Sequence, residues 1–337
     1  MKCVNTIELI PGMVLSQNII SKEGVKLLDK QTYLTEIHIH NLVNWGVNSL
    51  YILDGRDNKV VFIEKYKEIV KAVQEVFEGI QQSRLIPIME IRELVEEMIS
   101  PLIAMEGVLD YLYEVKSHSN YTFEHSVNVA ITTGVFSNWL HYGGAEYKNL
   151  IMAGLLHDIG KLSVPLQILD KPGNLLDSEF SAIKKHPEEG YNFFKTIDEI
   201  PAGTKMGVWQ HHERMDGSGY PCRLIGSEIH EYAKIVAVAD IYDAITSNRA
   251  YRSKLTPLAA MDEIADQMYD KLDVSVCIPI LENMRKYFIG RGVLLSNGQK
   301  GEIIMITPHA WTKPLVRTYN GVLWDLRLEK MSVVDVL

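Results

Sequence analysis

The chain has 337 residues, enough for about two or three domains with a sizeable core. Hydrophobic residues make up 47% and charged residues 23% of the sequence, which is typical of globular proteins and excludes a disordered chain. A net charge of −9 argues against general binding to duplex nucleic acid or to an anionic membrane surface.

Targeting and redox signals point to the cytoplasm. No apolar run reaches the about 18 uncharged residues that a membrane span needs, so none is expected. The N-terminal segment has Glu8 where a signal peptide would have its apolar region. The three cysteines, Cys3, Cys222 and Cys277, are an odd number without C-x-x-C spacing, so neither a disulfide framework nor a thiolate zinc site is expected.

Residues 1–60 are predicted to form a small α+β module. Short apolar runs rich in β-branched residues predict strands at Met13–Ile20, Val25–Leu28 and Ser49–Leu53. One helix is expected at Glu36–Trp45, capped by Thr35 and closed by Gly46.

Residues 61–117 carry the apolar stripe of amphipathic helices. Apolar side chains recur at three- and four-residue spacing from Phe62 to Ile80 and again from Ile91 to Met98. Prolines at positions 87 and 101 are expected to split these helices. The segment is interpreted as a connector that docks on the core or pairs with its copy in a homodimer.

Residues 118–290 are predicted to form a helical bundle, and residues 291–337 a small β unit packed on it. Asn297-Gly298 and Asn320-Gly321, each between apolar runs, are strong hairpin signals and predict about four strands in the β unit. The fold class is therefore mainly α. The predicted helices are Glu124–Leu140, Tyr147–Leu162, Ser178–His186, Glu188–Thr196, Lys205–His212, Ile229–Ser247, Pro257–Lys271 and Val274–Tyr287.

His157-Asp158 interrupts an apolar run that is predicted to be a buried helix, with Lys161 one turn further on. Buried polar side chains cost several kcal/mol unless they are paired or bind a metal ion. Imidazole beside carboxylate suits divalent iron, manganese or zinc, and a carboxylate can bridge two ions. The alternative is a buried His–Asp hydrogen bond.

Asp240 likewise lies within an apolar helical run. If the Asp240 carboxylate is buried there, it needs a hydrogen-bond partner or a cation to offset the cost of burial. Asp243, one turn further on, is expected to orient a metal ligand, to pair with Arg249 or Arg252, or to be an exposed helix acid.

His186 precedes Pro187, which favours a helix end at that position. His211 and His212 end another predicted helix, and a glycine-rich turn follows. Adjacent helical side chains point about 100° apart, so one ion would take only one of the pair in regular geometry. The other would serve a further ion or the substrate.

Together these residues resemble the HD-GYP subgroup of metal-dependent HD-domain phosphohydrolases. The resemblance rests on His157-Asp158 with Lys161 and on His-His-Glu-x-x-Asp-Gly-x-Gly-Tyr-Pro at 211–221, and it covers roughly residues 115–290. It implies an HD-type helical core with divalent metal ions, iron or manganese. It also implies hydrolysis of cyclic di-GMP to pGpG, and onward to GMP, by metal-activated hydroxide attack on phosphorus.

The resemblance also implies roles for individual residues. Asp158 would be the bridging carboxylate and, with Lys161, catalytic. The implied metal ligands are His125, His157, Asp158, His186, His211, His212 and Asp240. The substrate-binding set is Lys161, Tyr220, Arg249, Arg252 and Asp243.

One position departs from the family pattern. Some members place a glutamate four residues before the first metal histidine, where this chain has Tyr121. Two metal ions are therefore expected, and a third is in doubt. His212 is the ligand that depends on the third ion, and hydrolysis of pGpG depends on it as well.

Two alternatives stay open at this point. The same fold can hydrolyse 3′,3′-cyclic GMP-AMP or another phosphate ester. The chain can also be a catalytically silent scaffold that binds a nucleotide or a signalling partner. The input signal is not visible in the sequence.

Overall fold

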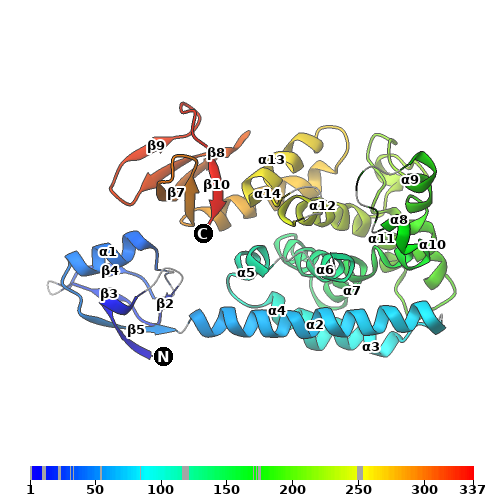
Figure 1. Ribbon diagram of the computed structural model, residues 1–337, viewed down its shortest axis with the longest axis horizontal. Coiled ribbons are helices and arrows are strands. Elements are labelled where there is room, and N and C mark those ends of the chain that lie inside the picture. The colour runs from blue at the N-terminus through cyan, green and yellow to red at the C-terminus, as the bar shows by residue number, and fades with distance from the viewer. Residues whose placement is uncertain are drawn as a thin grey trace. The chain divides into compact units, whose positions relative to one another are not determined.

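The computed structural model describes residues 2–337 except 10–12, 22–23, 31, 33, 54, 84, 116–120, 170, 172, 174–175 and 249–252. The chain divides into two compact units, one formed by residues 1–64 with 287–337 and the other by residues 65–286. Figure 1 shows a mainly helical chain with small sheets near both ends, as the sequence predicts. The packing of the β unit on the helical core stays a prediction.

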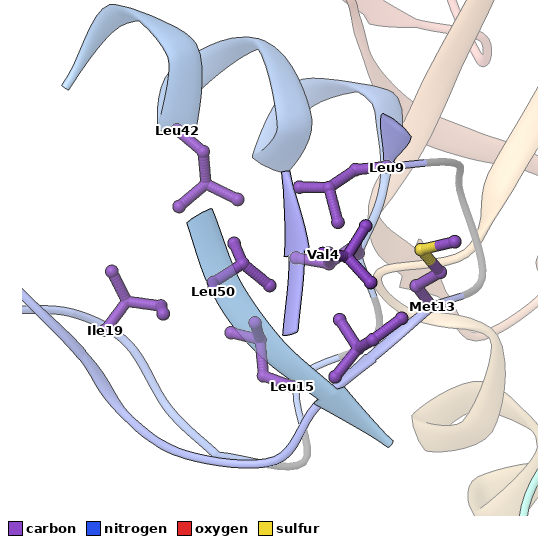
Figure 2. Packing of buried hydrophobic residues seen from close by; sticks show 9 residues of the cluster. Val4, Leu9, Met13, Leu15, Ile19, Leu42 and Leu50 are labelled. Atoms are coloured by element: carbon purple, nitrogen blue, oxygen red, sulfur yellow. The ribbon is translucent and has the colours of Figure 1, made fainter. Parts of the chain in front are cut away.

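The N-terminal module contains a three-stranded antiparallel sheet in the order β1-β5-β2. Its inward side chains form a small core with helix α1, which Figure 2 shows from close by. Thr35 caps α1 by accepting a hydrogen bond from His38 N at 3.2 Å, and Gly46 follows the helix with a φ of 72°, as predicted. The elements are β1 (Lys2–Asn5), the 3₁₀ turn η1 (Thr6–Glu8), β2 (Val14–Leu15), β3 (Ile19–Ile20), β4 (Lys26–Leu28), α1 (Glu36–Asn44) and β5 (Ser49–Leu53).

Two details of this module differ from the expectation. Strand β1 carries no sequence prediction, and the single strand expected at Met13–Ile20 is two short strands, β2 and β3, in different sheets. Bends at residues 16 and 17 separate the two strands. Apolar character alone does not reveal such a bend, because both strands place side chains in the same core.

The connector region is helical. It comprises α2 (Gly55–Ser83), α3 (Ile88–Glu93), the π-helical segment η2 (Leu94–Ile99), α4 (Ser100–Ile103) and α5 (Val108–Val115). The break expected near Pro87 is present, whereas the break expected at Pro101 is wrong. Pro101 lies in the first turn of α4, directly after the π-helical segment, where Ser100 Oγ donates to Val95 O at 2.7 Å. The chain turns instead at Gly107, which has a φ of 81°.

The helical core surrounds α7, which contacts α6, α11 and α12, while α10 packs on the turn that follows α7. None of the helices in the described part of the chain is both long enough and apolar enough to cross a membrane. The core elements are α6 (Tyr121–Trp139), α7 (Gly144–Leu156), η3 (Ile159–Ser163), α8 (Leu166–Leu169), α9 (Asp177–Ile183), α10 (His186–Phe194), α11 (Ala202–Gln210), η4 (Gly226–Glu228), α12 (Glu231–Thr246), α13 (Pro257–Gln267) and α14 (Val274–Phe288).

The C-terminal residues form an antiparallel sheet in the order β10-β6-β7-β8-β9. Asn297-Gly298 joins β6 to β7 and Asn320-Gly321 joins β8 to β9, with both glycines at positive φ, which confirms the two predicted turns. The last strand was not predicted. The strands are β6 (Gly292–Leu295), β7 (Lys300–Thr307), β8 (Ala310–Thr318), β9 (Leu323–Asp325) and β10 (Val333–Val336).

Candidate metal centre

The His157-Asp158 pair follows the end of a buried helix. Helix α7 ends at Leu156, and a 3₁₀ helix, η3, begins at Ile159. The prediction of one helix through Leu162 is therefore wrong. Asp158 leaves the α-helical region, with φ −100° and ψ 5°, and Lys161 N donates to Asp158 O at 2.9 Å. The chain bends here, and this bend presents the Asp158 carboxylate to the helices around α7.

Close packing at Gly160 brings a second ligand to this bend. A methyl group at Gly160 would lie 1.9 Å from His186 O and 2.5 Å from Gly190 N, closer than any van der Waals contact. Only glycine therefore lets α10 approach η3 closely enough for His186 to meet Asp158. His186 begins α10, at a helix end as Pro187 predicts.

Three buried histidines have the same internal hydrogen bond. Each directs Nδ1 to the main-chain carbonyl three residues earlier, at 2.7–2.8 Å: His157 to Gly154, His186 to Ile183 and His211 to Val208. A carbonyl oxygen only accepts, so Nδ1 carries a proton and Nε2 is the ring atom that faces the site. This bond orients an imidazole for a metal ion in the way that metal-binding histidines commonly show.

Asp158 lies between four imidazoles. Its Oδ2 atom is 3.4 Å from both His125 Nε2 and His157 Nε2. Its Oδ1 atom is 3.1 Å from His186 Nε2 and 3.9 Å from His211 Nε2. Each carboxylate oxygen therefore faces its own pair of histidines, which is the arrangement needed to bridge two cations.

Burial opposes ionisation of Asp158, but Lys161 and the neighbouring imidazoles hold its pKa well below the usual value. The Lys161 ammonium contacts Asp158 Oδ2, three residues away in the chain. Asp158 is therefore an anion at neutral pH. Its position, almost fully buried, makes an anion there costly unless cations lie close to it.

Several buried atoms of this cluster lack the partners that a closed hydrogen-bond network would give them. His186 Nε2 and His211 Nε2 lie 3.2 Å apart, and in two neutral rings with Nδ1 protonated each would present a lone pair to the other. His157 Nε2 and Asp158 Oδ1 are buried without a hydrogen-bond partner among the described residues. Divalent cations would satisfy all of these atoms, so the residues fit a metal centre.

Two groups of donor atoms meet the spacing for a metal ion, and in each group the atoms lie within 4.8 Å of one another. One group is His125, His157 and Asp158. The other is Asp158, His186, His211 and His212. His211 and His212 thus share one group, contrary to the expectation for adjacent helical residues, because helix α11 ends at Gln210 and the pair lies in the turn after it.

Asp243 and Asp240 flank His125 from α12. The Asp243 carboxylate is fully buried and lies 2.7 Å from His125 Nδ1 through Oδ2, while its Oδ1 accepts from Ser247 Oγ at 2.9 Å. Asp240 Oδ1 lies 3.2 Å from His125 Nε2. Burial lowers the pKa of His125, but the bonds to Asp240 and Asp243 outweigh it and raise the pKa to about 9. A cation at His125 Nε2 would therefore displace a proton.

The contacts of Asp243 agree with only one of the roles predicted for it. Both of its oxygens are engaged inside the protein, with His125 and Ser247. Its geometry fits the orientation of a metal ligand, as for a carboxylate that fixes a metal-binding imidazole. It does not fit the substrate-binding role, nor an exposed position on the helix.

The other predicted residues are placed as follows. The half-buried Tyr220 ring packs near the His212 ring, with centroids 4.6 Å apart and an interplanar angle of 31°. Burial, followed by the charges of Asp158 and Asp240, raises the pKa of Tyr220. Arg249 and Arg252 lie outside the described residues.

Glu213 is a buried acid close to the metal centre that the sequence reasoning did not single out. It is buried, and its two oxygens accept from Cys222 N at 2.6 Å and Leu224 N at 2.9 Å. A methyl group at Gly219 would lie 2.5 Å from Glu213 Cα, so the turn that carries Tyr220 packs directly on the residues that follow α11. The sequence does carry a signal for Glu213, because this acid directly follows the two adjacent histidines and precedes the glycine-rich turn.

The comparisons with known proteins agree with this geometry. The family model described as an HD domain matches residues 113–276. A cyclic di-GMP phosphodiesterase of Pseudomonas aeruginosa is 31% identical over 248 residues, covering 74% of this chain and 60% of that protein. A 3′3′-cGAMP-specific phosphodiesterase of Vibrio cholerae is 34% identical over 205 residues, covering 60% of this chain and 46% of that protein.

A third relative is the cyclic di-GMP phosphodiesterase response regulator RpfG of Xanthomonas campestris, 40% identical over 130 residues, covering 38% of this chain and 34% of that protein. This chain therefore spans less than two thirds of the length of each of these relatives. A solved structure of an HDG"Y"P protein from Bdellovibrio bacteriovorus shares the fold, with a TM-score of 0.54, 15% identity and coverage of 84% of this chain and 99% of that chain. Over residues 113–276 the chain is therefore similar to HD domains, and its fold is similar to that of a solved HD-GYP-type protein.

Proposed function

We propose that the protein is a metal-dependent phosphodiesterase that hydrolyses cyclic di-GMP to pGpG. The observation that carries this proposal is the Asp158 carboxylate, each of whose oxygens faces two imidazoles. Divalent cations held there would supply an activated water and would neutralise charge on the phosphoryl oxygens. Relatives named as cyclic di-GMP phosphodiesterases support the substrate class.

The protein side chains have distinct tasks in this proposal. Asp158 joins the two donor groups, and the main-chain bonds of His157, His186 and His211 keep their Nε2 atoms directed at it. Lys161 is only partly buried, at 23% side-chain exposure, so its ammonium can reach both Asp158 and a phosphate. A cation there stabilises negative charge that develops on the phosphoryl group.

The number and identity of the metal ions stay proposals. Two donor groups support two ions, and imidazole with carboxylate suits iron or manganese. His212 belongs to the second group and does not require a third ion of its own in this arrangement. Further hydrolysis of pGpG to GMP remains a prediction that product analysis tests.

A second substrate, 3′,3′-cyclic GMP-AMP, has a specific observation in its favour. Vibrio cholerae proteins named as 3′3′-cGAMP-specific phosphodiesterases are 34% and 35% identical to this chain over the matched residues. The silent-scaffold alternative has less support, because every ligand position of the family pattern except the one held by Tyr121 has its matching residue in this sequence. We also propose that the protein is located in the cytoplasm, forms a homodimer and interacts with a signalling partner.

The test uses purified protein loaded with manganese or iron and a panel of cyclic di-GMP, 3′,3′-cyclic GMP-AMP and pGpG. We expect hydrolysis of at least one cyclic dinucleotide, and a loss of at least about a thousandfold in Asp158→Asn with the fold retained. Asp198→Asn, which changes an exposed carboxylate, is the matched control. Full activity in Asp158→Asn would overturn the proposal.

A further inference from the structure

A cavity of about 410 Å³ lies between the connector and the first half of α7. This volume falls within the range of small-molecule sites, about 300–1,000 Å³. None of the residues that line the cavity belongs to either donor group found in the described part of the chain. The lining includes Arg92, Val95, Glu96, Ala145, Lys148 and Met152.

Helix α7 leads from this cavity to the metal centre. Lys148 and Met152 lie in the second and third turns of α7, and His157 directly follows its last residue. At a rise of about 1.5 Å per residue, the step from Lys148 to His157 amounts to about 14 Å along the helix axis. The cavity is therefore a second site, separated from the metal-binding atoms by the length of the helix.

The π-helical segment η2 forms another wall of the cavity, through Val95 and Glu96. Ser100 holds the wide turn, because its main-chain N–H and its hydroxyl both donate to Val95 O, the hydroxyl at 2.7 Å. Segments of π-helix are rare and occur frequently at functional sites. Neither donor group of the metal centre contains a residue of η2, so the metal centre does not account for this segment.

The base of the cavity is apolar. It is formed by the side chains of Val95 and Met152, which are buried, while Ala145 and Pro201 add apolar surface to the walls. An apolar group placed over this base would leave water, which favours its binding. A ligand of this cavity is therefore expected to have an apolar body.

The rim of the cavity carries two cations and one carboxylate. Arg92 makes one hydrogen bond in the described part of the chain, to Glu199 O at 2.9 Å, although a guanidinium has five N–H donors. Lys148 pairs with Glu96 at 2.8 Å, with side-chain exposures of 45% and 40%. Such exposed pairs are weak, and an ammonium has two further donors. Two cations against one carboxylate leave one positive charge, which favours a ligand with a single negative charge.

We propose that this cavity binds a small organic monoanion. Its charged group would contact Arg92 and Lys148, and its apolar body would cover Val95 and Met152. The first main-chain N–H groups of α7 have no side-chain cap from Gly143, so they add to the preference for an anion that the two cations create. The site goes beyond the proposed hydrolysis, because it uses none of the metal-binding residues.

The experiment titrates the metal-loaded protein with three matched probes. Benzoate carries a ring and a carboxylate, acetate carries only the carboxylate, and benzamide carries the ring without a charge. Isothermal titration calorimetry compares their affinities, and crystals soaked in 4-bromobenzoate locate the bromine by anomalous scattering. We expect benzoate to bind at least about tenfold more tightly than either acetate or benzamide, and the bromine to lie beside Met152.

Variants of the rim give changes of opposite sign. Arg92→Met and Lys148→Met should each weaken benzoate binding by about tenfold, because each removes a charged donor and keeps an apolar chain. Glu96→Gln should strengthen binding, since it removes the carboxylate that competes for Lys148. Lys71→Met breaks the exposed Lys71–Glu75 pair of α2 and is the matched control, which should bind benzoate as the wild type does.

The inference is overturned if no bromine lies between η2 and α7, if acetate or benzamide binds as tightly as benzoate, or if Lys148→Met binds benzoate as well as Lys71→Met does. Asp158→Asn separates the cavity from the metal centre. Retained benzoate binding in this variant supports the cavity, and loss of binding would assign the ligand to the metal centre instead. None of these measurements depends on hydrolysis, so a failure of the proposed function is recognised separately.

Discussion

His186 Nε2 and His211 Nε2 lie 3.2 Å apart, and each ring directs its Nδ1 to a main-chain carbonyl. In the neutral rings two lone pairs at this distance repel each other, and a cation bound by both nitrogen atoms would remove this repulsion. We therefore expect Mn²⁺ to stabilise the fold and EDTA to destabilise it. At a free metal concentration about a hundred times Kd, the gain in unfolding free energy is about 2.7 kcal/mol.

Differential scanning calorimetry with EDTA and with a Mn²⁺ series checks this expectation. His186→Gln serves as the control, since it removes one donor of the second group and should weaken the response. An identical Tm in EDTA and in saturating Mn²⁺ would contradict the account.

Asp243→Asn should weaken metal binding without abolishing the fold. The Asp243 carboxylate fixes His125 through a 2.7 Å contact to Nδ1, and loss of such outer contacts costs about 10–100-fold in metal affinity. Isothermal titration with Mn²⁺ measures the change. Ser247→Ala removes only the hydroxyl on the other carboxylate oxygen and should have a smaller effect. Equal affinities in the wild type and Asp243→Asn would refute the positioning role.

Gly160→Ala should destabilise the protein, because the added methyl group would lie 1.9 Å from His186 O. Overpacking of this kind costs about 1–3 kcal/mol, and here the backbone of a metal ligand must move. Gly79→Ala is the control. It lies on an exposed turn of α2 with nothing within 4 Å of the new methyl group, so it should stabilise by about 0.5–1 kcal/mol. Urea unfolding compares the two, and a neutral Gly160→Ala would show that α10 does not need this close approach.

Glu213→Gln should loosen the turn that carries Tyr220. The glutamine amide offers one acceptor oxygen where Cys222 N and Leu224 N each need one, and the unsatisfied donor costs about 1–3 kcal/mol. We expect a lower Tm and a higher KM for the dinucleotide with metal content preserved. Glu228→Gln, which changes an exposed acid of the same segment, is the control. If Glu213→Gln leaves both Tm and KM unchanged, the bracing role is wrong.

Cys222 and Cys277 should react with a thiol reagent in a fixed order as pH rises, Cys222 first. Cys277 is buried, and this burial raises the pKa of its thiol to about 12, so it should stay protonated and inert until the protein unfolds. Cys222 is exposed, but partial burial and Glu213 raise the pKa of its thiol, so its alkylation should increase between pH 7 and pH 9. Mass spectrometry after timed alkylation at pH 7 and pH 9 measures the order. Fast modification of native Cys277 would contradict the packing of α14.

Much of the fold was predictable because its signals are local. The Thr35 cap, the Gly46 stop and the two Asn-Gly turns each depend on a few neighbouring residues, and the structure confirms them. Pro101 was misread because a π-helical segment absorbs the proline without a break. The short strands β1 and β10 depend on pairing with distant strands, which periodicity does not report.

For the candidate site, the polar residues inside apolar runs identified the cluster, since buried polarity needs a compensating partner. The end of α7 at Leu156 was not predictable, because it depends on contacts between Gly160 and α10 that come from distant sequence. The same is true of Glu213, whose partners lie on the far side of a loop. These features are tertiary and leave only weak traces in the local sequence.

Anomalous diffraction from crystals grown with Mn²⁺ tests the central claim most directly. The account predicts two manganese peaks that share Asp158, one bound by His125 and His157 and the other by His186 and His211. An absence of manganese at Asp158, or imidazoles turned away from one another in its presence, would contradict it.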